Sequence, residues 1–253
     1  MIVPKQKVVI APKERIIVAL DVESAETARG IVAEIGSSVG AFKFGLQLYT
    51  AAGPDLVREL CQAGHRIFLD LKFHDIPTTV AKAGIEAARL GVWMFNVHAW
   101  GGREMMHRTM QDLRSVCELE GISRPFVIGV TVLTSSNDDT LREIGLETSA
   151  EQQVVRLAKL TAESGLDGVV ASPLETAEVR NAVDRDDFLV VTPGVRPLSA
   201  TNDDQKRVMT PGRAAAEGSN YLVVGRPITE ASDRLQALLS IQKEIDEAVA
   251  ALR

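Results

Sequence analysis

The sequence predicts an α/β fold, a single (β/α)8 TIM barrel, from three observations. Short β-branched runs alternate with longer amphipathic helical patterns, which is typical of parallel strands joined by helical crossovers. Eight runs can serve as strands, and eight is the number that closes this barrel. The length of 253 residues matches the barrel's usual length of about 250. No linker interrupts the series, so we expect one domain over residues 1–253, with residues 1–14 as an N-terminal extension.

The strand candidates are short apolar runs rich in Val, Ile and Phe, residues that favour the extended backbone. In chain order they are IIVAL (16–20), AFKFG (41–45), RIFLDLK (66–72), WMFNVHA (93–99), PFVIGVTVL (125–133), GVVAS (168–172), FLVVTPG (188–194) and YLVVG (221–225). A doubly wound open sheet is the alternative arrangement of such strands. It is disfavoured because ALDVES follows the first run, where a nucleotide-binding open sheet would carry a Gly-rich phosphate loop.

Amphipathic stretches fill the intervals between the strand candidates. Several end in Gly, as helix C-termini commonly do, and several begin near Pro or Ser, which favour the first turn. The clearest helices are expected over residues 24–36, 54–64, 78–91 and 149–165.

The composition narrows the class of protein. A net charge of −6 and the lack of a Lys/Arg cluster argue against nucleic-acid binding. No apolar run reaches the ~18 residues of a membrane span, and residues 1–13 lack the apolar core of a signal peptide. The two cysteines have no metal-ligand spacing and fit a reducing compartment. We therefore expect a cytoplasmic protein that binds neither membranes nor nucleic acid.

Polar residues collect at the ends of the strand candidates. In a (β/α)8 barrel the active site lies at the C-terminal ends of the strands and in the loops beyond them. The polar residues at those ends are Asp21, Lys43, Asp70, Lys72, Asp75, Asn96, His98, Thr134, Ser172, Arg196 and Arg226. For Asn96 and His98, which lie in an apolar run, a core position is the favoured interpretation.

The stretch FLDLKFHDIP (68–77) places three charges at the end of one strand candidate. Residues two apart in a strand point to the same face, so Asp70 and Lys72 share a side, and Asp75 follows just past the strand. Lys43 lies between two phenylalanines, and it points into the barrel if those rings pack under the helices. Charges inside a barrel cost several kcal/mol each unless they are paired. A structural ion-pair network is the alternative, but charges on successive strand ends favour an active site.

A second informative stretch, RPLSATNDDQKRVMTPG, follows the seventh strand candidate. Residues 196–210 show no apolar periodicity and are long for a βα loop. The alternatives are a solvated loop and a lid that closes Arg196 and Gln205 on a ligand. Thr210-Pro211 predicts the start of a helix.

After the eighth strand candidate, Gly225 and Arg226 have the chemistry of a phosphate site. Gly225 permits close approach of the backbone, and Arg226 supplies a fork-shaped cation. Many barrels bind phosphate with the loops after their seventh and eighth strands.

Several stretches together resemble the orotidine 5′-phosphate decarboxylase family. They run from VALD (18–21) to VVGRPIT (223–229) and include FKFG, FLDLKFHDIP, NVHA, VTVLTS, VTPGVRP and DQKR. The Asp-x-Lys-x-x-Asp signature is specific when it is combined with these other stretches, although sugar-phosphate enzymes of the same superfamily share it. One departure is Trp100, where bacterial members usually have Ser, and Thr78, where Asn is common, is a lesser one.

The resemblance implies a reaction and the residues that perform it. Orotidine 5′-monophosphate would lose CO2 to give UMP, with no metal or organic cofactor. Lys72 resembles the residue that stabilises a carbanion at C6 of the pyrimidine and protonates it. Asp70 and Asp75 would hold its ammonium charged and aimed, and Lys43 would balance their charge.

The resemblance also implies a homodimer with two shared active sites, because Asp75, Ile76 and Thr79 would reach into the partner's site. The binding residues it implies are Asp21, Lys43 and Thr79 at the ribose, Thr134 and Ser135 near the pyrimidine, Gln205 between base and phosphate, and Arg196, Gly225 and Arg226 at the phosphate.

Two other functions stay open for this sequence. One is a related Mg²⁺-dependent sugar-phosphate lyase or decarboxylase, against which the stretch PLSATNDDQKR and the intact Lys43 argue. The other is a barrel that binds a phosphoribosyl ligand without catalysis. Turnover measured in EDTA separates both from the decarboxylase.

Overall fold

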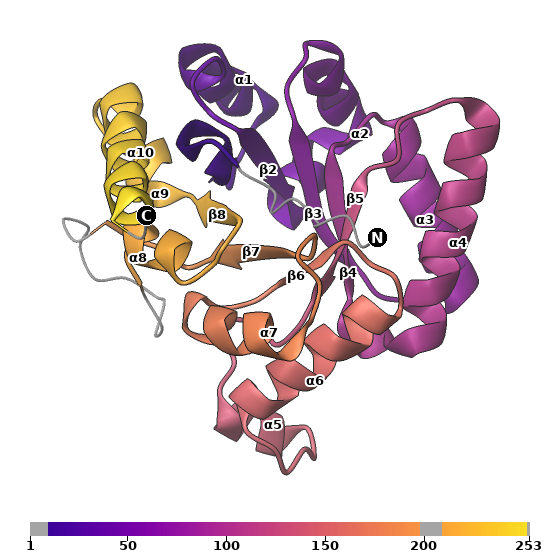
Figure 1. The fold of residues 1–253 in the computed structure, drawn as a ribbon. Coiled ribbons are helices and arrows are strands. Elements are labelled where there is room, and N and C mark those ends of the chain that lie inside the picture. Colours follow the sequence, from indigo (N-terminus) through magenta and orange to yellow (C-terminus); the bar gives the residue numbers. More distant parts are fainter. Residues whose placement is uncertain (1–9, 198–208, 252–253) are drawn as a thin grey trace, which may run out of the picture.

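The computed structural model describes residues 10–197 and 209–251, in which eight parallel strands close into a barrel in sequence order (Figure 1). The strands are β1 (Ile16–Ala19), β2 (Ala41–Gly45), β3 (Ile67–Phe73), β4 (Met94–His98), β5 (Phe126–Val130), β6 (Gly168–Val170), β7 (Leu189–Pro193) and β8 (Tyr221–Val224). Because β8 pairs with β1, the sheet has no free edge. The predicted barrel and each of its strands are confirmed.

Helices surround the barrel, and Figure 1 shows α10 beside α8 and α9 next to β8. The α-helices are α1 (Ala25–Ile35), α2 (Leu46–Gln62), α3 (Pro77–Arg89), α4 (Gly102–Glu120), α5 (Asp138–Glu143), α6 (Ala150–Glu163), α7 (Thr176–Ala182), α8 (Pro211–Ala216), α9 (Arg226–Thr229) and α10 (Arg234–Ala250). The 3₁₀ helices are η1 (Pro12–Arg15), η2 (Ala99–Gly101) and η3 (Pro173–Glu175). Within the described ranges, no helix combines the length and the apolarity needed to cross a bilayer.

One helix extends beyond its prediction. A helix was expected over residues 54–64, but α2 begins at Leu46 and continues through a kink at Gly53. Gly53 has φ 68° and ψ −172°, a backbone conformation that glycine adopts without strain, and Pro54 starts the second segment. The first segment makes only about two turns, too short for its apolar spacing to be distinguished from a loop.

Side chains of the barrel wall alternate between two hydrophobic layers. Phe42 and Phe44 of β2 point outward and pack with the helices, as in the sequence prediction. Lys43, between them, therefore points inward. The apolar side chains inside the barrel are Ile17, Ala19, Ala41, Phe68, Met94, Ile128, Leu189, Val191, Tyr221 and Val223.

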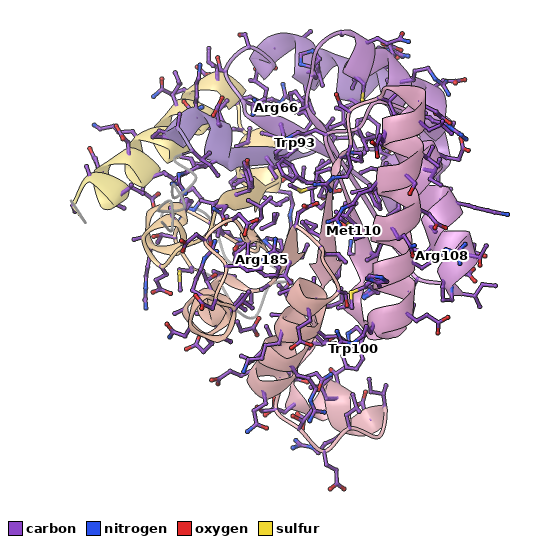
Figure 2. All side chains as sticks on the ribbon, turned by 45° about the vertical axis from the view of Figure 1, so that its right-hand side comes forward. Arg66, Trp93, Trp100, Arg108, Met110 and Arg185 are labelled. Atoms are coloured by element: carbon purple, nitrogen blue, oxygen red, sulfur yellow. The ribbon has the colours of Figure 1, made fainter. Side chains whose placement is uncertain are left out.

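Residues at the N-terminal ends of the strands close that end of the barrel. Ile10, in the described part of the expected N-terminal extension, is buried among the residues inside the barrel. Arg15 donates hydrogen bonds to the carbonyl oxygens of Ile10 and Ser219. Trp93, labelled in Figure 2, lies edge-on to Tyr221 with ring centroids 5.0 Å apart. This end is filled by packing.

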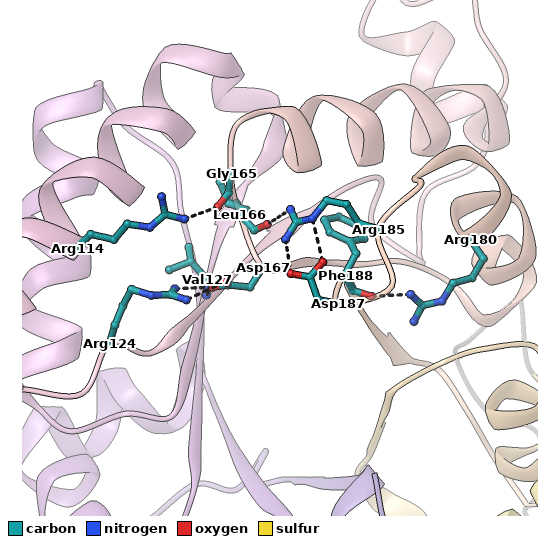
Figure 3. Close-up of polar contacts among 10 residues, drawn as sticks. All are labelled: Arg114, Arg124, Val127, Gly165, Leu166, Asp167, Arg180, Arg185, Asp187 and Phe188. Carbon is teal, nitrogen blue, oxygen red and sulfur yellow. Dashed lines mark hydrogen bonds and ion pairs between the residues drawn. The ribbon is translucent and has the colours of Figure 1, made fainter. Parts of the chain in front are cut away.

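Arginine side chains tie the same ends of neighbouring strands together (Figure 3). Arg124 binds both carboxylate oxygens of Asp167, at 2.7 and 2.9 Å, and Asp167 also accepts the backbone N–H of Val127. Arg185 donates to the carbonyl oxygen of Leu166 at 2.8 Å. These contacts join the starts of β5, β6 and β7, opposite the end where the polar residues collect.

Candidate active site

A cavity of about 500 Å³ lies at the C-terminal ends of the strands. This volume is within the range of about 300–1,000 Å³ that is usual for small-molecule sites. Apolar side chains such as Val132, Val170, Val191 and Val223 form much of its wall. The predicted site residues that line it are Asp21, Lys43, Asp70, Lys72, Thr134, Arg196, Gly225 and Arg226.

Four of these residues form a row of alternating charges. The Nζ of Lys43 lies 2.9 Å from Oδ1 of Asp21 and 3.4 Å from Oδ2 of Asp70. The Nζ of Lys72 lies 2.7 Å from the other oxygen of Asp70. The row therefore runs from Asp21 through Lys43 and Asp70 to Lys72, across the ends of β1, β2 and β3. Each charge has an opposite neighbour, which offsets the cost of burial.

Burial differs along this row. The side chains of Lys43 and Asp70 are only 10% and 13% exposed, whereas those of Lys72 and Asp21 are 30% and 58% exposed. Burial by itself lowers the pKa of Lys43, but the carboxylates of Asp70 and Asp21 outweigh it, so its pKa lies above the ordinary value. Lys43 is thus a permanent cation that fixes two carboxylates, and Lys72 has the more accessible ammonium.

The backbone departs from a regular strand where it carries Lys72. β3 and β4 pair at Leu69 and Phe95 and again at Phe73 and Val97. Residues 70–72 of β3 therefore lie opposite a single residue of β4, Asn96, and this irregularity is a β-bulge. Within the described ranges, Lys72 is the one residue other than glycine with a positive φ, 52°. Such a conformation is strained for a residue with a Cβ, and strain of this kind is concentrated at functional sites.

Asn96, fully buried on β4, joins the two charged residues of the bulge. Its Nδ2 donates to Oδ1 of Asp70 at 2.7 Å, and its Oδ1 accepts the backbone N–H of Lys72 at 2.8 Å. The sequence analysis counted Asn96 among the polar residues at the strand ends but favoured a core position for it. Only the pairing of β3 with β4 reveals these contacts.

Gly45, at the end of β2, is a second residue whose importance the sequence did not indicate. A Cβ added there would lie 3.1 Å from both Oδ1 of Asp21 and Nζ of Lys43. Glycine at this position therefore leaves room for the ion pair.

His98, at the end of β4, lies against His74 with ring centroids 5.5 Å apart. Its Nδ1 is buried and has no hydrogen-bond partner among the residues that the structure describes. Burial, and then the charges of His74 and Lys72, lower the pKa of His98. The lowered pKa favours the neutral form of the ring.

Arg196 lines the cavity after β7, and Gly225 and Arg226 line it after β8, the strand that pairs with β1. The backbone N–H of Arg196 bonds to the carbonyl oxygen of Met209, which joins the two described ends of the expected lid. Thr210 caps α8 by accepting the N–H of Arg213, and the predicted helix start is confirmed. Gln205 lies outside the described residues.

The other predicted residues lie outside the cavity lining. Asp75 is exposed just past β3, and its carboxylate accepts the backbone N–H of Ile76 at 2.6 Å. Ile76 is 66% exposed, and Thr79 is exposed on the first turn of α3. Ser135 is exposed next to Thr134. In the described part of the chain, no group of three or more His, Cys, Asp or Glu side chains is arranged to hold a metal ion.

Comparison with known proteins identifies the family. The family model described as "Orotidine 5′-phosphate decarboxylase / HUMPS family" matches residues 14–241. The chain belongs to the orotidine 5′-phosphate decarboxylase family. The resemblance drawn from the sequence motifs is confirmed.

Individual members of the orotidine 5′-phosphate decarboxylase family cover nearly the whole chain. The orotidine 5′-phosphate decarboxylase of Syntrophotalea carbinolica is 51% identical over 243 residues, 96% of this chain and 98% of its own. That of Geobacter sulfurreducens is 51% identical over 233 residues, 92% of this chain and 96% of its own. The crystal structure of the Lactobacillus acidophilus enzyme is similar, with a TM-score of 0.81 and 40% identity, covering 91% of this chain and 98% of that one.

Proposed function

We propose that this chain decarboxylates orotidine 5′-monophosphate to UMP and CO2, the last step of de novo UMP synthesis. The observation that carries the proposal is the row of alternating charges that ends with the ammonium of Lys72 in the cavity. The name of the relatives with 51% identity supports it.

The chemistry requires a cation at one point. Loss of CO2 from C6 of the pyrimidine leaves an electron pair in an sp² orbital that is not conjugated with the ring carbonyls. A cation next to C6 stabilises this charge as it develops, and the same carbon must then receive a proton. We assign both roles to Lys72. Asp70 keeps its ammonium aimed, because their atoms are 2.7 Å apart.

The rest of the cavity supplies binding groups of matching chemistry. Asp21 accepts and Lys43 donates hydrogen bonds, which suits the hydroxyls of a ribose. Thr134 lines the cavity on the loop after β5, where it can contact the pyrimidine, and Ser135 follows it as an exposed residue outside the lining. Arg196 and Arg226, in the cavity lining after β7 and β8, carry guanidinium groups, which suit the phosphate.

We further propose that the protein acts as a homodimer with shared sites. Asp75, Ile76 and Thr79 are exposed side by side after β3. An exposed isoleucine between two polar residues is the kind of edge that a partner subunit covers. From there Asp75 and Thr79 would complete the partner's site, with Asp75 adding a second carboxylate near Lys72.

The direct test is the loss of ultraviolet absorbance of the orotate ring when purified protein is mixed with orotidine 5′-monophosphate in EDTA. We expect full turnover, because we propose that the reaction needs no metal or cofactor. Recovery only on addition of Mg²⁺ would favour the rival sugar-phosphate chemistry. No turnover under either condition would favour a binding barrel.

Replacement of Lys72 tests the assigned role. Lys72→Ala should abolish turnover, because it removes both the cation and the proton, while circular dichroism remains that of the folded protein. Lys243→Ala is the matched control, since Lys243 is an exposed lysine on α10. A near-normal kcat for Lys72→Ala would refute the assignment of both roles to Lys72.

A further inference from the structure

The bulge in β3 leaves a backbone N–H without a carbonyl partner on β4, and a side chain takes the place of that carbonyl. Where residues 70–72 face Asn96 alone, the backbone N–H of Lys72 is not paired with a carbonyl of β4. A buried N–H without a partner costs about 1–3 kcal/mol. The Oδ1 of Asn96 takes the place of the missing carbonyl at 2.8 Å.

The second bond of Asn96 fixes the orientation of its amide. A backbone N–H can only donate, and the ionised carboxylate of Asp70 can only accept. Both demands are met with Oδ1 toward Lys72 and Nδ2 toward Asp70, at 2.8 and 2.7 Å. One buried side chain thus holds the backbone of the lysine and the carboxylate that its ammonium contacts.

We propose that Asn96 is a positioning residue for Lys72. The inference rests on the proposed function, and it adds a residue that acts through Lys72 and Asp70 rather than on the substrate. The geometry points to Asn96 as the reason why Lys72 keeps its left-handed backbone, and hence why its Nζ lies 2.7 Å from Asp70. Misplacing a catalytic group by an ångström can cost about 100-fold in rate.

Neither alanine nor an ionised aspartate can make the same two bonds. Ala leaves the Lys72 N–H unpaired in a buried site and removes one of the two donors to Oδ1 of Asp70, the other being Nζ of Lys72. Asp has the same shape and still accepts the N–H, but its second oxygen would face Asp70 at the position of the present donor. Two carboxylates this close share one proton, so the introduced carboxyl can replace the amide donor only while it is protonated.

This gives Asn96→Asp a diagnostic pH profile. At acid pH the protonated carboxyl donates to Asp70 and restores the arrangement. As pH rises the proton is lost and repulsion turns Asp70 away from the ammonium. The charged and titratable groups near position 96 are Asp70 and Lys72 on β3, Lys43 on β2, Asp21 after β1, and His98 with its neighbour His74.

The test compares Asn96→Ala and Asn96→Asp with the wild type and with Thr192→Ala. Thr192 is an equally buried polar residue of the barrel wall, and its hydroxyl bonds to Ser219, away from the lysines. For Asn96→Ala we expect kcat to fall about 100-fold, the scale of a misplaced catalytic group, with the affinity for UMP retained. For Asn96→Asp we expect a lower kcat that declines further as pH rises. Thr192→Ala should lower Tm and leave kcat unchanged.

Two results would overturn the inference. One is a kcat for Asn96→Ala no lower than that for Thr192→Ala. The other is a kcat for Asn96→Asp that equals the wild-type kcat at every pH. This second result is decisive even if Asn96→Ala does not fold. Absence of turnover by the wild type would instead refute the proposed function, and the inference would fall with it.

Discussion

Trp100 donates a hydrogen bond from Nε1 to the carbonyl oxygen of Thr131, 2.8 Å away. Thr131 follows β5 directly and begins the loop that carries Val132, Leu133 and Thr134 into the cavity lining. The hydroxyl of Thr131 bonds in turn to the carbonyl oxygen of Val170 on β6. Trp100 therefore anchors the wall that we assign to the pyrimidine.

Trp100→Phe should loosen this loop, because it keeps most of the ring and removes the N–H. A neutral hydrogen bond contributes about 1 kcal/mol, so we expect Tm to fall by roughly 2–4 °C. We also expect KM for orotidine 5′-monophosphate to rise with little change in kcat. The control is Trp93→Phe, at the other end of β4 (Figure 2), which should affect Tm alone. An unchanged KM for Trp100→Phe would show that the bond does not position the loop.

Mixing two inactive variants tests the shared site. Asp75→Ala and Lys72→Ala should each be inactive as homodimers, because each site would lack one of the two residues. In random heterodimers one of the two sites keeps both, so activity should return to roughly a quarter of the wild type. Subunit exchange is verified by native mass spectrometry. If no activity returns after exchange, Asp75 does not act across an interface.

Arg226→Ala should distinguish the phosphate from the rest of the substrate. A charge-assisted bond contributes about 1.5–3 kcal/mol, so kcat/KM for orotidine 5′-monophosphate should fall at least tenfold. For orotidine, which has no phosphate, the change should be small, and free guanidinium should recover part of the loss with the monophosphate. Arg213→Ala on α8, where the arginine pairs with Glu217, is the control. Equal slowing of both substrates would mean that Arg226 does not bind the phosphate.

His98 gives a pH dependence of stability whose sign follows from its pKa. Burial, and then the charges of His74 and Lys72, lower the pKa of His98. An unfolded chain takes up this proton near about pH 6.5, whereas the folded protein resists it. Stability is therefore full above about pH 6.5 and falls as pH drops below that value. The measurement is the free energy of urea unfolding between about pH 7 and pH 5.

His98→Gln, which cannot titrate, should reduce this loss of stability at acid pH. His107→Gln on α4, where the histidine is exposed, should leave the pH dependence as it is in the wild type. The same slope in the wild type and His98→Gln would assign the effect to other groups.

The sequence by itself determined the barrel and the charged residues at one end of it. Alternation with a period of two residues is local, so it placed Lys43 on the inner face between Phe42 and Phe44. Parallel strands bring their C-terminal ends together, so Asp21, Lys43 and Asp70 could be expected to meet although they are far apart in the chain. The first segment of α2, too short for a clear period, escaped this kind of reasoning.

The tertiary structure alone decided how these residues are held. The bulge at residues 70–72 depends on the register between β3 and β4, which no pattern within either strand encodes. From that register follow the left-handed backbone of Lys72 and the two bonds of Asn96, a residue that looked like core from its strand alone. The bond from Trp100 of η2 to Thr131 after β5 likewise joins segments that are distant in the sequence. Such contacts arise only when the barrel closes, because closure sets which buried donors and acceptors must find each other.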